Sequence, residues 1–263
     1  MGQVNSTGEF KQEHAKLLKR ALTCDAAELH TILGSAESEV IRAALKNVAL
    51  EAEHLQNLLQ RRDLDGALFT YICKHKLSHT RSVVNQLLAH PLINPQQIKT
   101  VLERLHLLEL LNIAILPGQA ADVRIAAEHQ LCKRLPTAPL GIKITLARRA
   151  TYPILEALML EGLPQVIEPC LNNPRMKEAA IYRYLHGQNV GAESIIKIAR
   201  HPRWNKRPNI RHAILRNRHT PKALFTQFLP GTPPQQARQL LFSKHLKPAQ
   251  KEWIREILGK KSV

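Results

Sequence analysis

The chain has 263 residues and a formal net charge of +17 at pH 7, and 44% of its residues are apolar. That apolar fraction excludes wholesale disorder, and the longest nearly apolar stretch, residues 105–116, is too short to cross a bilayer, which takes about 20 apolar residues. Gly is sparse and only 4% of the residues are aromatic, whereas Leu, Ala and Ile are plentiful, so the composition favours helices over sheets.

Helix signals begin near Asp25 and recur along the whole chain. Asp25 and Glu28 have the spacing of a capping box, which predicts a short helix there. Ser35 is expected to cap the next helix, which places Val48 on its apolar face and continues towards Leu59.

Three later helices share a start signal, an Asn or Thr followed by Pro. These pairs are Asn94-Pro95, Thr220-Pro221 and Thr232-Pro233. The first of these helices is expected to run to Leu116, where Pro and Gly stop it. We find no convincing strand pattern, with its alternating polar and apolar residues, anywhere in the sequence.

Several segments repeat a common pattern in which one helix ends, a polar turn rich in Asn, His or Pro follows, and another helix begins. Four copies align loosely: LLAHPLINPQQIKTVL from Leu87, CLNNPRMKEAAIYRYL from Cys170, ILRNRHTPKALFTQFL from Ile214 and LLFSKHLKPAQKEWIREIL from Leu240. A weaker fifth copy spans residues 146–160. Helices with one apolar stripe cannot bury it alone, so neighbouring hairpins are expected to cover one another.

The pattern predicts an all-α protein, an irregular α-solenoid (superhelix) of stacked short helical hairpins. The alternative is a non-repeating α bundle whose helix starts look alike because capping chemistry is limited. We expect a flexible N-terminal tail at residues 1–9, an N-terminal helical region at 10–135 and a basic repeat region at 136–263 that is continuous with it.

The stretch around Ile210 resembles a known type of repeat, the HEAT-like bacterial repeats of the leucine-rich-repeat-variant family. Their motif is similar to V-R-x-A-L-x-R-N-x-x-T-P-x-x-L. The matching positions are Ile210, Arg211, Ala213, Ile214, Arg216, Asn217, Thr220, Pro221 and Leu224. The resemblance covers about residues 140–230 and implies an α-superhelical binding scaffold. A related architecture is used by some alkylpurine DNA glycosylases, but the motif positions are mainly structural and transfer no activity.

The positive charge is concentrated in the last third of the chain. Residues 174–263 hold 19 Lys or Arg and 4 Asp or Glu, a balance of +15, whereas residues 1–173 are nearly neutral at +2. No acidic residue occurs between Glu193 and Glu252. Such an asymmetry indicates a polyanionic partner for the C-terminal third, or else serves only solubility.

The candidate polyanion-binding residues surround one helix expected from about Pro208 to Asn217. They are Arg200, Arg203, Trp204, Lys206, Arg207, Arg211, Arg216, Arg218 and Lys222. Like charges four residues apart repel by a few tenths of a kcal/mol per pair, which a phosphate-rich partner would relieve. Trp204 is expected either to stack on an unpaired base or to staple its loop to the next hairpin.

No residue set in the sequence specifies a reaction, so we assign no catalytic residue, metal or cofactor. The sequence CKHKLSH brings Cys73, His75 and His79 together, but the ligand count for zinc is incomplete. A base-excision glycosylase requires a carboxylate beside the basic face. The carboxylates that folding could bring there are Glu156, Glu161, Glu168, Glu178 and Glu193.

The function expected from these features is non-enzymatic binding of a polyanion by the basic C-terminal third. Nucleic-acid backbone, DNA or RNA, is the first candidate, recognised through shape and charge. The alternatives are an interaction scaffold for an acidic protein or peptide, and a HEAT-like alkylpurine DNA glycosylase. Four scattered cysteines without a CxxC pair, and a polar N-terminus, favour a reducing, cytoplasmic setting with no membrane partner.

Overall fold

The computed structural model describes the backbone of residues 5–35 and 37–259. Over this range the chain forms 18 α-helices and two short 3-10 helices and contains no strand, which confirms the predicted all-α class. The first four residues of the predicted tail at 1–9 lie outside the described residues, and α1 begins at Asn5. Flexibility of the tail and a boundary between residues 135 and 136 stay predictions.

The chain divides into two compact units. Unit 1 comprises the residues up to His106 together with Pro117–Ala126, and unit 2 comprises Leu107–Leu116 together with the residues from Ala127 onwards. The helices of unit 1 are α1 (Asn5–Thr23), α2 (Ala26–Ser35), α3 (Ser38–Ala44), α4 (Ala52–Leu58), α5 (Gly66–Lys74), η1 (Lys76–His79), α6 (Arg81–Ala89) and α7 (Pro95–Leu102). Helix α9 (Ala121–Arg134) contributes residues to each unit.

The remaining helices belong to unit 2. They are α8 (Leu107–Ile115), α10 (Leu140–Arg149), α11 (Tyr152–Glu161), α12 (Pro164–Asn172), α13 (Glu178–Leu185), α14 (Ala192–Arg200), α15 (Pro208–Leu215), α16 (Lys222–Phe228), η2 (Leu229–Gly231), α17 (Pro234–Leu241) and α18 (Pro248–Gly259).

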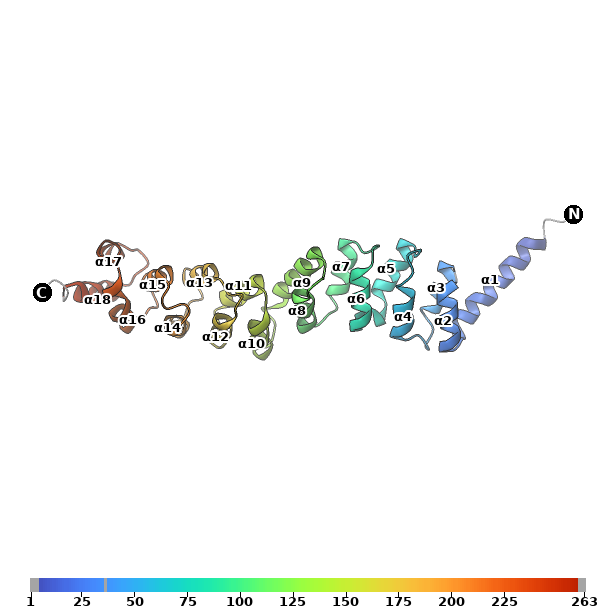
Figure 1. Cartoon of the computed structure of the whole chain (residues 1–263), viewed down its shortest axis with the longest axis horizontal. Coiled ribbons are helices and arrows are strands. Elements are labelled where there is room, and N and C mark those ends of the chain that lie inside the picture. Colours follow the sequence, from blue (N-terminus) through green and yellow to red (C-terminus); the bar gives the residue numbers. More distant parts are fainter. Residues whose placement is uncertain (1–4, 36, 260–263) are drawn as a thin grey trace. The chain divides into compact units, whose positions relative to one another are not determined.

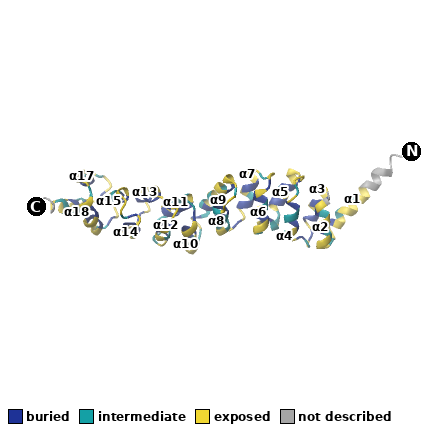
Figure 2. Cartoon of the chain, in the orientation of Figure 1, coloured by how far each residue is buried: buried dark blue, intermediate teal, exposed yellow. Residues whose placement is uncertain are grey.

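Within each unit, many helices pack on the helix two positions further along the chain. In unit 1, α2, α4 and α6 follow one another in one row, and α3, α5 and α7 in a second row (Figure 1). In unit 2, α10, α12 and α14 form one row and α11, α13 and α15 form another (Figure 1). This sequential packing is that of a solenoid-like array of helical hairpins. Figure 2 shows buried residues on the inner faces of the helices in each unit.

A recurring Asn or His ties the end of each of several helices to the end of the helix two positions earlier. Asn173 is one example: its Nδ2 donates to the carbonyls of Ala147 and Ala150 at 2.9 and 3.3 Å, and its Oδ1 accepts the N–H of Arg175 at 2.8 Å. We call these residues the helix-end ladder. Its members are Asn47, His75 and His90 in unit 1 and Asn173, His201 and Asn217 in unit 2.

Histidine performs the same task as asparagine in this ladder. His75 accepts the N–H of Leu77 on Nδ1 at 3.2 Å, which leaves the proton on Nε2, and Nε2 donates to the carbonyl of Leu45 at 3.0 Å. His201 uses its nitrogens in the same way, with the side-chain carbonyl of Asn172 as its acceptor at 3.1 Å. Each imidazole therefore replaces an amide that donates on one side and accepts on the other.

The third residue after each ladder position closes the turn with a backbone hydrogen bond to the carbonyl of the ladder residue. Most of these residues also turn a side chain into the core. The positions are Leu50, Ser78, Ile93, Met176, Trp204 and Thr220. All but Ile93 are at least nine-tenths buried. The polar turns of the sequence repeat thus share one geometry, in which the third residue after the ladder residue is usually buried.

Two helices that the sequence predicts as continuous are interrupted. The expected helix from Ser35 towards Leu59 divides into α3 and α4, because Asn47 forms a ladder turn between them and leaves Val48 96% exposed. The expected helix from Asn94 to Leu116 divides into α7 and α8. Its start is correct, since Asn94 accepts the N–H of Gln97 at 2.9 Å in a capping box.

None of the helices in the described part of the chain combines the length and the apolar character that crossing a membrane requires.

Candidate polyanion-binding site

Trp204 belongs to the architecture and not to the exposed surface. Its side chain is only 2% exposed, and its indole N–H donates to the carbonyl of Leu171 at 3.0 Å. It occupies the buried position three residues after the ladder residue His201. This burial contradicts the exposed face that stacking on a base needs. Trp204 does staple its loop to a hairpin, but to the preceding one, at Leu171 of α12, and not to the next one.

Arg203 is held by the same turn. Its guanidinium donates to the carbonyls of Asn173 and Met176 at 3.3 and 3.1 Å and lies 4.4 Å from the ring of Trp204. These carbonyls belong to the turn that follows α12, so Arg203 links two successive turns. Its charge is largely used in stabilising the fold.

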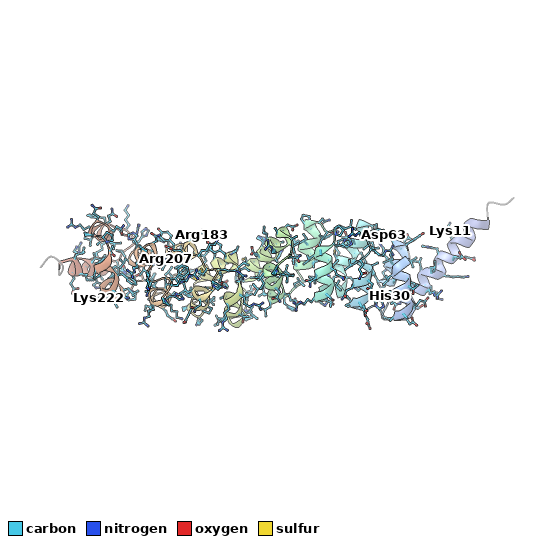
Figure 3. All side chains as sticks on the ribbon, in the orientation of Figure 1. Lys11, His30, Asp63, Arg183, Arg207 and Lys222 are labelled. Carbon is cyan, nitrogen blue, oxygen red and sulfur yellow. The ribbon has the colours of Figure 1, made fainter. Side chains whose placement is uncertain are left out.

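Three further candidate cations have partners. Arg207 lies 3.9 Å from the carboxylate of Glu178 and Lys222 lies 3.0 Å from that of Glu256. Arg211 is half-buried, donates to the carbonyl of Asn205 and lies 5.3 Å from the ring of Phe228. Arg207 is the N-cap residue of α15 and Lys222 is the first residue of α16, so they stand at the starts of two different helices (both are labelled in Figure 3).

Four candidate cations are exposed and form no hydrogen bond or ion pair through their side chains with any residue that the structure describes. They are Arg200, Lys206, Arg216 and Arg218. Arg200 is the last residue of α14 and Lys206 directly precedes Arg207, the N-cap residue of α15. Arg216 is the C-cap residue of α15, and Arg218 follows it at the other end of that helix. An eight-residue helix is about 12 Å long, so the predicted patch separates into two groups.

Arg216 and Arg218 line a pocket of about 100 Å³ at the C-terminal end of α15. His186 and His245 also line it, together with Leu185, Gly187, Ala213 and Asn217. No carboxylate is among the lining residues. We call this the α15 cation pocket.

Two neighbouring histidines report the positive field around this pocket. The pKa of His212 is lowered from its ordinary value by burial and, secondarily, by Arg216 and His186. The pKa of His219 is lowered by burial and then by Arg218 and Lys247. The Nδ1 atom of His212 is buried and has no hydrogen-bond partner among the described residues. Burial is the larger cause at both histidines, and the neighbouring cations add to it.

Sequence reasoning missed two residues of this pocket. His186 and His245 come from turns 27–32 residues away in the sequence and were not part of the basic stretch. It also missed Phe242, the C-cap residue of α17, whose side chain is 84% exposed. Its signal was available, since Phe242 lies off the buried stripe formed by Ala237 and Leu240.

The carboxylates that a glycosylase would require are mostly neutralised. Four of the five have a cationic partner within 4.0 Å: Glu156 with Arg183, Glu161 with Lys143, Glu178 with Arg207 and Glu193 with Lys197. These pairs leave no unpaired carboxylate among the four to stabilise a developing positive charge.

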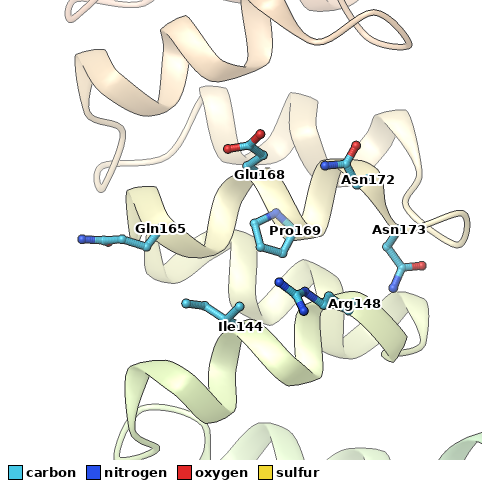
Figure 4. A pocket seen from close by; sticks show the side chains of 7 residues that line it. All are labelled: Ile144, Arg148, Gln165, Glu168, Pro169, Asn172 and Asn173. Atoms are coloured by element: carbon cyan, nitrogen blue, oxygen red, sulfur yellow. The ribbon is translucent and has the colours of Figure 1, made fainter.

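Glu168, the fifth carboxylate, lines a wider pocket of about 520 Å³ between α10 and α12. Figure 4 shows Arg148 reaching from α10 towards Pro169, while the carboxylate of Glu168 points away from Arg148. None of the seven lining residues is aromatic. The pocket lacks the pairing of a carboxylate with an aromatic platform that base excision requires, so it gives the glycosylase alternative no support.

The side chains of Cys73 and His75 in the CKHKLSH segment serve the fold through burial and hydrogen bonds. Cys73 is buried, and both ring nitrogens of His75 are engaged in the ladder. Burial raises the pKa of the Cys73 thiol to about 11 and that of Cys170 to about 12, so both remain protonated at neutral pH. Among the described residues, no group of three or more His, Cys, Asp or Glu is arranged to hold a metal ion.

Comparison with known proteins identifies no matching family model, no matching curated protein and no matching solved structure.

Proposed function

We propose that this protein binds the sugar-phosphate backbone of a nucleic acid through the α15 cation pocket, with Arg200 and Lys206 as a second contact group. The carrying observation is a pocket lined by Arg216, Arg218 and two histidines without a carboxylate. It lies in a stretch that has no acidic residue from position 194 to position 251. A guanidinium binds phosphate oxygens in a bidentate manner, which makes arginine suited to this ligand.

Phosphate is the favoured ligand because the side chains of Arg216 and Arg218 have no hydrogen-bond or ion-pair partner among the described residues. Arg203, Arg207 and Arg211 are engaged by carbonyls, a carboxylate and aromatic rings, whereas Arg216 and Arg218 are not. Like charges held together in one pocket repel, and a chain of phosphates removes that repulsion and releases its own counterions. Binding is expected to follow charge and shape and not base sequence.

We also propose that the array is a HEAT-like one of the leucine-rich-repeat-variant type. The motif residues have structural roles that support this: Ala213 and Ile214 are buried, Asn217 is a ladder residue, and Thr220 donates to the carbonyl of Ile214. Arg216 also stands at a motif position, but it has no such internal role.

The test is a salt titration of binding to labelled duplex DNA and duplex RNA, followed by fluorescence anisotropy. The double variant Arg216→Ala/Arg218→Ala is expected to bind at least about tenfold more weakly and to lower the salt slope by nearly two, since each phosphate contact contributes about 0.9. The charge-matched control is Lys16→Ala/Lys19→Ala on α1, where both lysines are exposed, and its binding is expected to match the parent protein.

Two results would overturn the proposal. One is the absence of binding at low salt, and the other is an Arg216→Ala/Arg218→Ala variant that binds as the control does. An acidic protein partner retained after nuclease treatment, and lost in the double variant, would instead favour the interaction-scaffold alternative.

A further inference from the structure

A second cationic pocket lies in unit 1, whose sequence region is nearly neutral overall. The pocket, of about 360 Å³, is formed at the C-terminal ends of α3 and α5 and is lined by Leu45, Lys46, Asn47, Tyr71, Lys74, His75 and Lys76. Three of these seven side chains are lysines and none is a carboxylate. We call it the Tyr71 pocket.

Tyr71 is the unusual member of this set. It is 36% exposed, and its hydroxyl forms no hydrogen bond with any residue in the described part of the chain. Phe69 and Ile72 on the same helix are fully buried, so α5 turns these side chains to the core and Tyr71 to the surface. A tyrosine presented in this way offers one aromatic face to a ligand.

Two carbonyl groups at the helix ends of this pocket are already occupied. Cations are often stabilised at helix C-termini by the last carbonyl groups. Here the carbonyl of Leu45 accepts from His75 at 3.0 Å, and the carbonyl of Lys74 accepts from Arg104 at 2.7 Å. Arg104 thereby adds a fourth positive charge beside the pocket.

The three lysines of this pocket are not used by the part of the fold that the structure describes. Lys46, Lys74 and Lys76 form no side-chain hydrogen bond or ion pair with the residues that the structure describes. Lys76 also acts on His75, whose pKa is lowered mainly by burial and in part by this charge. Because both nitrogens of His75 are bound in the ladder, the imidazole stays neutral and leaves the lysines as the charged groups.

We propose that the Tyr71 pocket binds an unpaired nucleotide of a single-stranded nucleic acid, with the base stacked on Tyr71 and the flanking phosphates contacted by Lys46, Lys74 and Lys76. The combination of one aromatic face with a basic rim and no carboxylate is the pattern by which proteins hold single strands without reading sequence. A duplex, whose bases are already stacked on one another, gains only the phosphate contacts. This site is separate from the α15 cation pocket and does not rest on the function proposed for it.

The experiment uses the full chain carrying Arg216→Ala/Arg218→Ala, so that unit 1 is measured without the α15 cation pocket. The probe is a fluorescent oligothymidylate of about ten nucleotides, with a duplex of the same length as comparison. In this background Tyr71→Ala is expected to weaken single-strand binding about tenfold, and Tyr71→Phe is expected to keep it within about twofold, because stacking needs the ring and not the hydroxyl. Circular dichroism confirms that each variant is folded.

Cross-linking locates the contact independently of affinity. An oligonucleotide containing 5-bromodeoxyuridine, irradiated on the full chain, is expected to attach to Tyr71 and to lose that product in Tyr71→Ala. Binding that falls in Lys74→Ala/Lys76→Ala but not in Tyr71→Ala would overturn the proposal, since it would describe a simple cation cluster. Cross-linking to unit 2 alone would also overturn the proposal, and so would the absence of single-strand binding by the Arg216→Ala/Arg218→Ala protein. Neither outcome would change the duplex-binding titration that tests the α15 cation pocket.

Discussion

The two units share one architecture but use their cations differently. Both are built on the helix-end ladder, with Asn47, His75 and His90 in one and Asn173, His201 and Asn217 in the other. In the strongly basic unit 2, four of the eight candidate cations interact with carbonyls, carboxylates or aromatic rings of the protein itself. In unit 1, three lysines around Tyr71 are left uncompensated. Net charge therefore does not measure how much charge a surface offers to a ligand.

The comparison is tested most strongly at Trp204, which we assign to the fold and not to binding. Trp204→Ala is expected to lower the free energy of unfolding by about 3–5 kcal/mol, because it removes a fully packed aromatic side chain and leaves the carbonyl of Leu171 without its donor. Urea denaturation followed by circular dichroism measures the change.

The control for Trp204 is Tyr182→Ala on α13, where the side chain is 42% exposed and the loss is expected to stay below about 1 kcal/mol. Nucleic-acid affinity of Trp204→Phe, which keeps most of the packing, is expected to equal that of the parent protein. A Trp204→Phe variant that folds normally but binds nucleic acid much more weakly would contradict this assignment and would indicate that Trp204 takes part in binding.

Because both units contain the helix-end ladder, removing a ladder residue is expected to cost the same unfolding free energy in each unit. This cost is smaller than that of Trp204→Ala. Asn47→Ala and Asn173→Ala are each expected to lower the free energy of unfolding by about 2–3 kcal/mol, since each leaves two carbonyls and one N–H without their partner. Asn209→Ala, which removes only an exposed contact with Glu178, serves as the control and is expected to cost less than about 0.5 kcal/mol.

Unequal costs at Asn47 and Asn173 would break the comparison. A large loss in one unit only would mean that the ladder is an essential support there and an accessory in the other. Hydrogen exchange of the amides at the turn N–H groups, Ala49 and Arg175, gives a local measure that does not depend on the global transition.

The sequence was sufficient for the helical class and the hairpin stack, because capping pairs and apolar stripes are local signals. It failed at helix ends such as Asn47, where the turn is set by a carbonyl 26 residues away and not by neighbouring residues. It left two roles open for Trp204, because the buried role of that position becomes clear only when its turn is compared with the turns at Leu50 and Met176.

The candidate site was harder to predict than the fold. A count of charges included Arg203 and Arg211, whose internal partners are brought to them by folding. The same count passed over Tyr71 and the lysines beside it, because acidic residues elsewhere in the first two-thirds of the chain balance them. Only contacts distinguish a cation that supports the fold from one that is available to a ligand.

The smallest expected effect concerns the histidines that replace asparagine in the ladder. Burial lowers the pKa of His75 and of His201, and Lys76 and Arg203 add to the shift, while hydrogen bonding to Leu45 and the charge of Glu168 oppose it. A histidine whose folded pKa lies below its unfolded value binds protons preferentially in the unfolded state. Its stabilising contribution is therefore complete above the unfolded value of about 6.5 and is lost as the pH falls through that value towards the folded one.

Asparagine makes the same pair of hydrogen bonds at Asn47, Asn173 and Asn217 and does not titrate in this range. The variant His75→Asn/His201→Asn is therefore expected to stay within about 1 kcal/mol of the parent protein at about pH 7 and to lose less stability on going to about pH 5. Exchange of the exposed His30 for Asn (Figure 3) controls for the loss of an imidazole as such. The test is the thermal unfolding of the parent protein, the double variant and the His30→Asn control at both pH values. Parallel losses in the parent protein and the double variant would contradict the prediction, since they would show that protonation of these imidazoles does not lower the stability of the fold.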